Sequence, residues 1–184
     1  MPKLGIYGGT FDPIHLGHLH VVTSLLQENT VDRILLIPAG QPRLRENAPV
    51  ASAQDRRAMC QVALADLPEE IAKKVEVNPI EVLRIGPSYS IDTVEAIEQA
   101  FPNYELALIL GTDAYNKIDQ WHRADELKKK VEFIVIDRPE HPGQATHKIA
   151  ALKVSATSIR SGASQDTSPA VTAYIKEHNL YASK

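Results

Sequence analysis

The chain has 184 residues, of which 43% are hydrophobic, and a formal net charge of −3 at pH 7. This length supports a substantial core, so we expect residues 1–184 to form a single domain. A mildly acidic chain without a cationic stripe is not typical of nucleic-acid binders, and no apolar run approaches the roughly 20 residues that cross a bilayer. Cys60 is the single cysteine, which excludes an internal disulfide. Because the N-terminus also lacks a secretory signal, we expect a cytoplasmic protein with no nucleic-acid or membrane partner.

Short apolar runs alternate with amphipathic segments along the chain. Runs typical of buried strands occupy residues 4–7, 34–37, 75–77, 106–110 and 133–136. Helical periodicity covers roughly residues 17–28, 53–66, 90–100, 121–129 and 168–178. We expect Ser90 or Asp92 to cap the third of these helices. The alternation predicts an α/β fold with an open, doubly wound parallel sheet, in which ligands bind beyond the carboxyl ends of the strands.

The segment from Gly8 to His18 lies between the first expected strand and the first expected helix. A strand, a glycine turn and a helix start favour an anion, because unpaired backbone N–H groups and the helix dipole point toward it. Gly8 and Gly9 have no side chain that would keep a polyphosphate from the backbone. His15 and His18 are three residues apart and face the same way, so both imidazoles can donate hydrogen bonds to phosphate oxygens. The segment predicts a nucleotide that is bound through its phosphates.

Each part of this segment has a simpler interpretation when taken alone. A glycine pair after a strand is common, and a histidine at a helix start is more often a cap or a surface residue. A zinc site is an alternative for His15 and His18, but the sequence offers no third ligand nearby. Thr10 adds a hydroxyl donor, and we expect Gly17 to leave room where a larger side chain would crowd a ligand. The complete string is far more specific than its parts.

A long loop is expected beyond the second strand, over residues 40–53. It contains Pro42, Pro49, Arg43 and Arg45, and it shows little periodicity. Its position at the ligand-binding edge predicts a lid. A surface excursion without a role is the alternative.

Two strings carry a resemblance to a known superfamily. Residues 8–18 read GGTFDPIHLGH and residues 154–160 read VSATSIR. They resemble the GGTFDPxHxGH and ISSTxIR signatures of the nucleotidylyltransferase superfamily, with Ala156 in place of the commoner serine. The strings come from distant parts of the chain, so chance does not explain both. The resemblance implies the Rossmann-like nucleotidylyltransferase fold.

Further segments are similar to those of bacterial nicotinate-nucleotide adenylyltransferases, so the likeness extends over nearly the whole chain. They are residues 86–93 (GPSYSIDT), residues 110–113 (LGTD) followed by Trp121, and residues 174–181 (YIKEHNLY). Many members carry Pro-His-Lys or Pro-His-Arg in the lid, where this chain has Arg43-Leu44-Arg45. We expect Arg45 to supply the cation there, although Arg43 is the alternative.

The resemblance implies adenylyl transfer from ATP to nicotinate mononucleotide, giving deamido-NAD and pyrophosphate in NAD biosynthesis. The residues expected to act in catalysis are His18, His15 and Arg160. The residues expected to contact ATP are Gly8, Gly9, Thr10, Phe11, His15, His18, Gly111, Asp113, Ser155, Thr157, Ser158 and Arg160. The residues expected to contact nicotinate mononucleotide are Arg45, Ser88, Tyr89, Ser90, Thr93, Asp113 and Trp121.

The resemblance also implies a division of roles. We assign His18 mainly to the α-phosphate, His15 to the β- and γ-phosphates, and Trp121 to stacking on the nicotinate ring. The attacking group is a phosphate monoester whose second pKa is near 6, so it needs no general base at neutral pH. We expect Mg2+ to be held by phosphates and water, with no ligand from the protein.

Three other functions are kept as alternatives. They are adenylyl transfer to nicotinamide mononucleotide, adenylyl transfer to phosphopantetheine, and nucleotide sensing without catalysis. The segment 88–93 together with Trp121 disfavours phosphopantetheine, and the intact His15, His18 and Arg160 disfavour a sensor. A Rossmann dehydrogenase is disfavoured, because no G-x-G-x-x-G follows the first strand and no acidic partner stands at the end of the second. The sequence leaves the oligomeric state open, with a homo-oligomer among the alternatives.

Overall fold

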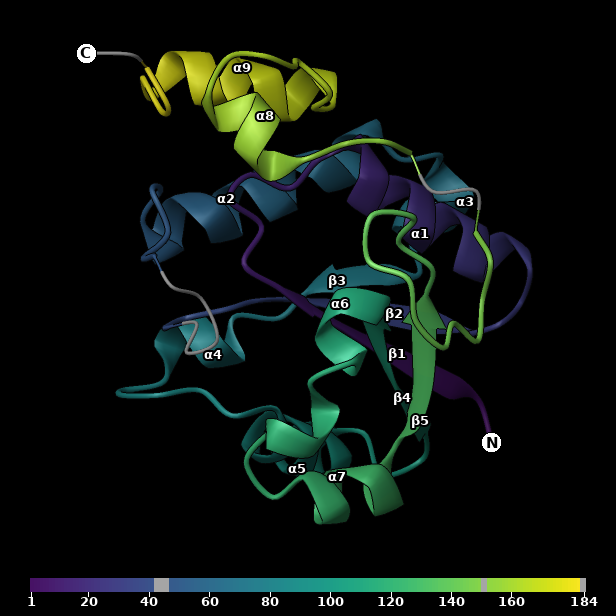
Figure 1. Cartoon of the computed structure of the whole chain (residues 1–184). Helices are drawn as coiled ribbons and strands as arrows, with labels where there is room; N and C mark the ends of the chain where they lie inside the picture. Colours follow the sequence, from purple (N-terminus) through teal and green to yellow (C-terminus); the bar gives the residue numbers. More distant parts are fainter. Residues whose placement is uncertain (42–46, 150–151, 183–184) are drawn as a thin grey trace.

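The computed structural model describes residues 1–41, 47–149 and 152–182. A parallel five-stranded sheet with the strand order β3-β2-β1-β4-β5 forms its centre (Figure 1). The strands are β1 (Lys3–Gly9), β2 (Arg33–Pro38), β3 (Val75–Val77), β4 (Glu105–Gly111) and β5 (Glu132–Ile136). The chain starts in the middle of the sheet, builds one half and then crosses to the other. The expected doubly wound α/β fold is therefore confirmed.

Helices cover both faces of the sheet (Figure 1). The α-helices are α1 (Leu16–Gln27), α2 (Ala53–Ala63), α3 (Glu69–Ala72), α4 (Ile80–Leu83), α5 (Ser90–Ala100), α6 (Thr112–Tyr115), α7 (Ala124–Lys130), α8 (Ala156–Arg160) and α9 (Pro169–Glu177). Two 3-10 helices, η1 (Leu64–Asp66) and η2 (Ile118–Gln120), lie between them. Among the described residues, no helix is both long enough and apolar enough to cross a membrane.

The core consists of two apolar clusters, one on each face of the sheet. Alternation along each strand produces them: Ile34 and Leu36 of β2 join one cluster, and Leu35 and Ile37 join the other. Helices α1, α2 and α9 pack into the first cluster, whereas α5 and α7 pack into the second. Residues 34–37 of β2 are buried on both faces, as expected for a central parallel strand.

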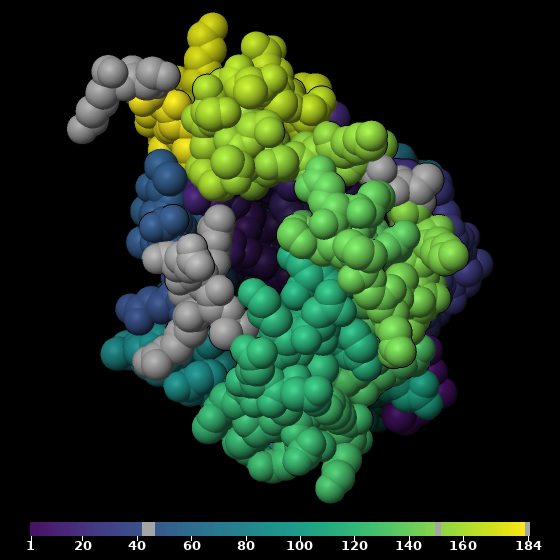
Figure 2. All heavy atoms as spheres, viewed as in Figure 1, coloured from purple at the N-terminus to yellow at the C-terminus, as the bar shows by residue number. Residues whose placement is uncertain are grey.

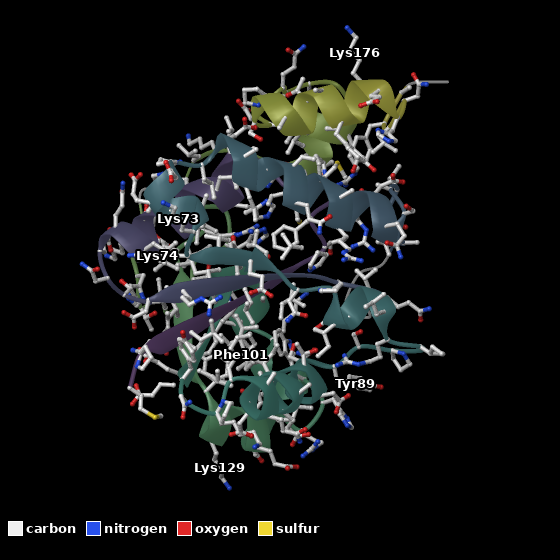
Figure 3. All side chains as sticks on the ribbon, turned by 180° about the vertical axis from the view of Figure 1, so that it is seen from behind. Lys73, Lys74, Tyr89, Phe101, Lys129 and Lys176 are labelled. Atoms are coloured by element: carbon white, nitrogen blue, oxygen red, sulfur yellow. The ribbon has the colours of Figure 1, made fainter. Side chains whose placement is uncertain are left out.

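The carboxyl ends of the strands meet at one edge, where the turn after β1 lies beside the turn after β4. Gly9 pairs with Pro38 of β2, and Tyr7 pairs with Ile109 of β4. Figure 3, which views the molecule from behind, shows Tyr89 on this side of the sheet. Lys74, just before β3, lies on the opposite side. The motif of residues 8–18 starts at the carboxyl end of β1, so the motif of residues 154–160 can meet it only at this edge.

One local expectation is wrong. Helix α5 begins at Ser90, its N-cap residue is Tyr89, and no side chain caps it. Ser90 and Asp92 lie inside the first turn, where Asp92 still complements the helix dipole. Four short helices, α3, α4, α6 and α8, carry too few residues to show a period of 3.6 in the sequence.

Candidate active site

The opening motif lies at the bottom of a hollow on the molecular surface. In Figure 2 the floor of this hollow is dark purple, the colour of the N-terminal part of the chain. The yellow-green part of the chain that carries α8 borders the hollow above, and green and teal parts border it on the opposite side. Residues from both ends of the sequence and from its middle therefore surround one space.

His15 is the N-cap residue of α1, and its side chain is fixed by the backbone. Its Nδ1 accepts a hydrogen bond from the Gly17 N–H at 3.1 Å. A ring nitrogen that accepts cannot carry the proton, so this network assigns the proton of neutral His15 to Nε2. The Nε2–H group is then the donor that His15 can offer to a ligand.

His18, at the N3 position, completes a capping box by reaching back to His15. Its Nδ1 accepts from the His15 N–H at 3.1 Å, and the two imidazoles stack with ring centroids 3.7 Å apart and an angle of 22° between their planes. The edge of Phe11 supports the His18 ring from below, with centroids 4.9 Å apart. The expectation that both histidines face the same way is confirmed, and both present Nε2–H donors.

Both histidines are neutral at physiological pH. Burial, reinforced by the nearby Arg138 guanidinium, lowers the pKa of His15 to about 4. Burial, together with the adjoining His15 ring and Arg138, holds the pKa of His18 well below its usual value. A neutral imidazole with its proton on Nε2 still donates from that nitrogen, so both rings can hydrogen-bond phosphate oxygens.

Each glycine of the motif would be affected differently by an added side chain. A Cβ on Gly8 would meet nothing within 4 Å, so the backbone there is open to a ligand. A Cβ on Gly17 would lie 2.9 Å from Cε1 of His15. Gly17 is therefore required by the His15 ring itself, which differs from the expected clash with a ligand. Gly9 is closed off by Phe11, whose ring would lie 3.0 Å from an added Cβ.

Phe11, predicted to contact ATP, has its side chain in the core. It is 2% exposed and adopts a left-handed backbone conformation, with φ of 50°. Only its backbone is placed to meet a ligand, and its ring instead supports His18. Thr10 is half-buried, and its carbonyl oxygen accepts a bond from Arg56. The predicted contacts of Thr10 and Phe11 with ATP remain predictions.

Asp12 connects the opening motif to three other segments. Its buried carboxylate accepts hydrogen bonds from the N–H groups of Val50 and Ala51 and from the hydroxyl of Tyr181, the last at 2.7 Å. Its carbonyl oxygen accepts a bond from Arg160 Nη1 at 2.8 Å. Asp12 thus fixes the turn after β1 against the start of α2, against α8 and against the C-terminal segment.

The second motif lies directly beside the first. Ser155 caps α8 by accepting from the Ser158 N–H at 3.3 Å, and the Thr157 hydroxyl accepts from Arg160 Nη2 at 3.2 Å. Val154 lies close to Gly17, because an added Cβ there would be 3.6 Å from the Val154 Cβ. The structure thus brings the predicted phosphate ligands Ser155, Thr157, Ser158 and Arg160 to the start of α1.

A carboxylate, that of Asp113, follows the end of β4, and the Arg138 guanidinium lies beside it. Asp113 Oδ1 lies 3.7 Å from Arg138 Nε, and both side chains sit over Gly111. Arg138 follows β5, and its charge acts on His15 and His18. Sequence analysis assigned no role to this arginine, although its place soon after a strand puts it at the ligand-binding edge.

Two buried side chains at this edge hold the loops in place. Arg56 of α2 is 1% exposed and donates to the carbonyl oxygens of Thr10, Ala39 and Gly40, at 2.8, 2.6 and 3.3 Å. The buried Thr112 hydroxyl accepts from the Arg138 N–H at 3.1 Å and so fixes that residue. Nothing in the local sequence pattern distinguishes these two residues from ordinary helical positions.

Four of the residues predicted for the mononucleotide, Ser88, Tyr89, Ser90 and Thr93, lie at the start of α5 or just before it, whereas Asp113 lies on α6. Tyr89 and Trp121 both pack against the second apolar cluster, and the Tyr89 ring lies 4.3 Å from the His122 ring, centroid to centroid. Ser90 begins α5. Within the described part of the chain, neither the buried Ser88 Oγ nor the buried Trp121 Nε1 has a hydrogen-bond partner.

Thr93 is the most deeply placed of this group. It is 2% exposed, donates to Glu81 at 2.8 Å and accepts from Arg84 Nη1 at 3.2 Å. Burial raises the pKa of Glu81. Thr93 therefore ties α5 to α4, and its predicted contact with the substrate would require one of these bonds to be exchanged. Arg43 and Arg45, predicted as lid cations, lie outside the described residues.

No group of three or more His, Cys, Asp or Glu side chains in the described ranges could hold a metal ion. Three carboxylates lie in this region of the described fold: that of Asp12 is engaged by N–H and hydroxyl donors, that of Asp113 faces Arg138, and that of Asp166, whose charge acts on His15, accepts from Ser164. This donor set fits a metal ion that arrives bound to a polyphosphate and its own water molecules.

Comparison with known proteins agrees with this geometry. Residues 6–162 match the model of the cytidylyltransferase-like family. A Bacillus pumilus protein described as a probable nicotinate-nucleotide adenylyltransferase is 34% identical, with 100% of both chains covered. A Shouchella clausii protein with the same description is 32% identical, with 98% of this chain and 97% of the relative covered.

Solved structures show the same fold. A Plasmodium falciparum nicotinic acid mononucleotide adenylyltransferase complexed with NaAD superimposes with a TM-score of 0.81 at 20% identity, covering 98% of each chain. The same enzyme complexed with APC gives a TM-score of 0.76 over 98% of each chain, also at 20% identity. From its sequence relatives and its motifs, the chain belongs to the nicotinate-nucleotide adenylyltransferases, within the cytidylyltransferase-like family.

Proposed function

We propose that this chain transfers the adenylyl group of ATP to nicotinate mononucleotide, giving deamido-NAD and pyrophosphate. The observation that carries the proposal is the pair of stacked, neutral imidazoles at the start of α1, both with Nε2–H available as a donor. Such a pair, next to a helix N-terminus, is suited to hydrogen-bonding phosphate oxygens. The relatives carry the same activity in their descriptions.

The reaction is a substitution at the α-phosphorus of ATP. An oxygen of the mononucleotide phosphate forms the new P–O bond, and the bond from the α-phosphorus to the bridging oxygen breaks, so pyrophosphate leaves. The attacking phosphate is mostly ionised at neutral pH and needs no base. What the protein must supply is alignment and stabilisation of the charge that builds on the phosphoryl oxygens.

Side chains at the starts of α1 and α8 supply this alignment and stabilisation in the proposal. His18 donates from Nε2 to the α-phosphate, where the charge develops, and His15 donates to the β- and γ-phosphates. Ser155, Thr157 and Arg160 hold the same phosphates from α8. Arg138, whose charge reaches both histidines, adds to the positive potential.

Mg2+ belongs to this proposal as an ion carried by the triphosphate, which His15, Thr157 and Arg160 hold. When bound, it neutralises part of the charge on the phosphates and keeps much of its own water. On the mononucleotide side, Trp121 stacks on the pyridine ring, and Tyr89 and the start of α5 receive its carboxylate. Asp113 accepts hydrogen bonds from ribose hydroxyls. We further propose that residues 1–184 act as a single domain.

A substrate panel tests the proposal. The purified chain is given ATP and Mg2+ with nicotinate mononucleotide, nicotinamide mononucleotide or phosphopantetheine, and pyrophosphate and the adenylylated product are both quantified. We expect the highest kcat/KM with nicotinate mononucleotide. His178→Ala, which changes an exposed histidine at the C-cap of α9, is the matched control for His18→Ala. Equal values for acid and amide would remove the specificity claim, and the absence of pyrophosphate with all three would favour a sensor.

A further inference from the structure

Arg123 has an unusual backbone and an unusually complete set of partners. It is the N-cap residue of α7 and adopts a left-handed conformation, with φ of 52° and ψ of 43°. Its guanidinium donates to both oxygens of Glu95 on α5, at 2.8 and 3.2 Å, and to both oxygens of Glu126 on α7, at 2.6 and 2.9 Å. Asp92 of α5 lies 3.9 Å away.

This geometry uses the shape of the guanidinium and not only its charge. Glu126 accepts from Nε and Nη2, and Glu95 accepts from Nη1 and Nη2. A lysine ammonium cannot form two such bidentate pairs. The side chains of Arg123 and Glu95 are each about one-third exposed, at 33% and 32%. Single ion pairs at such sites contribute little, but a bidentate network fixes the relative position of the groups that it joins.

The network joins α5 to the start of α7, and the residues of the proposed pyridine site lie next to the starts of these two helices. Trp121 and His122 immediately precede Arg123, and Tyr89 is the residue from which α5 starts. The rings of Tyr89 and His122 already lie against one another, and Trp121 packs on the same apolar cluster as Tyr89. Helices α5 and α7 lie side by side in Figure 1, and Figure 3 shows Tyr89 near the start of α5.

We infer that Arg123 is a positioning residue for the mononucleotide: by tying α5 to the start of α7, it sets the place of Trp121 relative to Tyr89. This inference rests on the proposed function, because it takes the Trp121–Tyr89 region as the pyridine site. Arg123 does not itself meet the substrate. Its loss should therefore weaken recognition of the mononucleotide and leave recognition of ATP at the opening motif unchanged.

The chain offers a matched control for this network. Lys130, at the other end of α7, forms a single ion pair with Glu98 of α5 at 2.7 Å. Lys130→Ala therefore removes a charge and an α5–α7 contact of the same kind, but at the end of α7 that is distant from Trp121 in the chain. Trp121 is the only tryptophan, so intrinsic fluorescence reports its surroundings directly.

The experiment compares Arg123→Ala, Arg123→Lys, Glu95→Gln and Lys130→Ala with the unchanged chain. We expect Arg123→Ala to shift the Trp121 emission, to weaken its quenching by nicotinate mononucleotide, and to lower kcat/KM for that substrate by about tenfold to a hundredfold, as a displaced positioning group can. The KM for ATP should stay unchanged. Glu95→Gln and Arg123→Lys should show the same changes in smaller measure, and Lys130→Ala should show none.

Two outcomes would overturn the inference. One is an Arg123→Ala protein whose emission and KM for the mononucleotide equal those of Lys130→Ala. The other is an equal rise of both KM values, which indicates general loosening. If Arg123→Ala does not fold, Arg123→Lys and Glu95→Gln carry the same comparison. Failure of the unchanged chain to produce the dinucleotide would instead refute the proposed function. The emission shift needs no turnover, so it would still show whether Arg123 fixes the position of Trp121.

Discussion

At the scale of single residues, the site depends on which nitrogen of each histidine faces outward. A backbone N–H occupies Nδ1 of both His15 and His18. Because an accepting nitrogen carries no proton, each neutral ring has its proton on Nε2. The short spacing of the two histidines on the first turn of α1 thus fixes their tautomers as well as their direction.

His18→Ala tests the more central of the two donors. Loss of one preorganised donor to the developing charge lowers kcat by about 10²-fold or more. Steady-state kinetics with ATP and nicotinate mononucleotide measures the change, with unfolding in urea to show that the variant is folded. A folded His18→Ala protein with normal turnover would contradict the role assigned to this ring.

Gly17→Ala tests whether the His15 ring is fixed by its own turn. The new Cβ would lie 2.9 Å from Cε1 of His15, so the ring must move away from its place against His18. We expect the KM for ATP to rise by roughly tenfold, with a smaller effect on the KM for the mononucleotide. Gly8→Ala adds the same methyl where nothing lies within 4 Å, so it leaves the His15 ring in place and any loss it causes reports the ligand. An unchanged KM for ATP in Gly17→Ala would count against this account of His15.

At the scale of elements, Asp12 holds the opening turn to the rest of the site. Its carboxylate accepts hydrogen bonds from two N–H groups just before α2 and from the Tyr181 hydroxyl, and its carbonyl oxygen accepts from Arg160 of α8. Burial and the bond to Asp12 raise the pKa of Tyr181, so its hydroxyl stays a donor at neutral pH. The C-terminal segment therefore supports a turn that lies far from it in the sequence.

Tyr181→Phe tests this support by removing one hydroxyl. We expect the free energy of unfolding to fall by about 1 kcal/mol, as for the loss of one partly buried hydrogen bond. The kcat/KM for ATP should also fall, because the opening turn loses a partner. Tyr174→Phe is the matched control, since its hydroxyl bonds Asp55 of α2 and not Asp12. If both variants gave identical kinetics, the link from Tyr181 to the site would be refuted.

The elements were largely predictable from the sequence, whereas their connections were not. Continuous apolar runs marked β1, β2, β4 and β5, and the string from Gly8 to His18 marked the turn before α1. Arg56 could not be found in this way, because arginine is rarely buried and its partners are carbonyl oxygens from two separate connections, those after β1 and after β2. Arg123 was missed because its partner Glu95 lies on another helix. Thr93 was predicted as a substrate contact, but its bond to Glu81 on α4 could not be predicted for the same reason.

At the scale of the whole molecule, the strand order brings distant segments to one edge. Starting at the centre of the sheet places the turn after β1 between the ends of β2 and β4. The position of the site therefore followed from the predicted topology. The depth of His15 in that edge did not follow, because burial depends on how the distant residues Val154 and Asp166 lie against the start of α1.

This burial predicts how stability varies with pH. The pKa of His15 is lowered from 6.5 to about 4 by folding, so between these values the unfolded chain binds more protons than the folded one. The free energy of unfolding should therefore fall as the pH is lowered through this range. His15→Asn keeps an N-cap acceptor but cannot titrate, and it should flatten the dependence in urea unfolding. An identical slope in both proteins would show that His15 is not the group responsible.

The central claim is that the triphosphate of ATP lies over the start of α1, within reach of both Nε2 atoms. A crystal structure with a non-hydrolysable ATP analogue tests it most directly. We predict hydrogen bonds from His18 Nε2 to an α-phosphate oxygen and from His15 Nε2 to the β- or γ-phosphate, with α8 closing the other side. A triphosphate bound elsewhere, with the two imidazoles facing only solvent, would contradict the account.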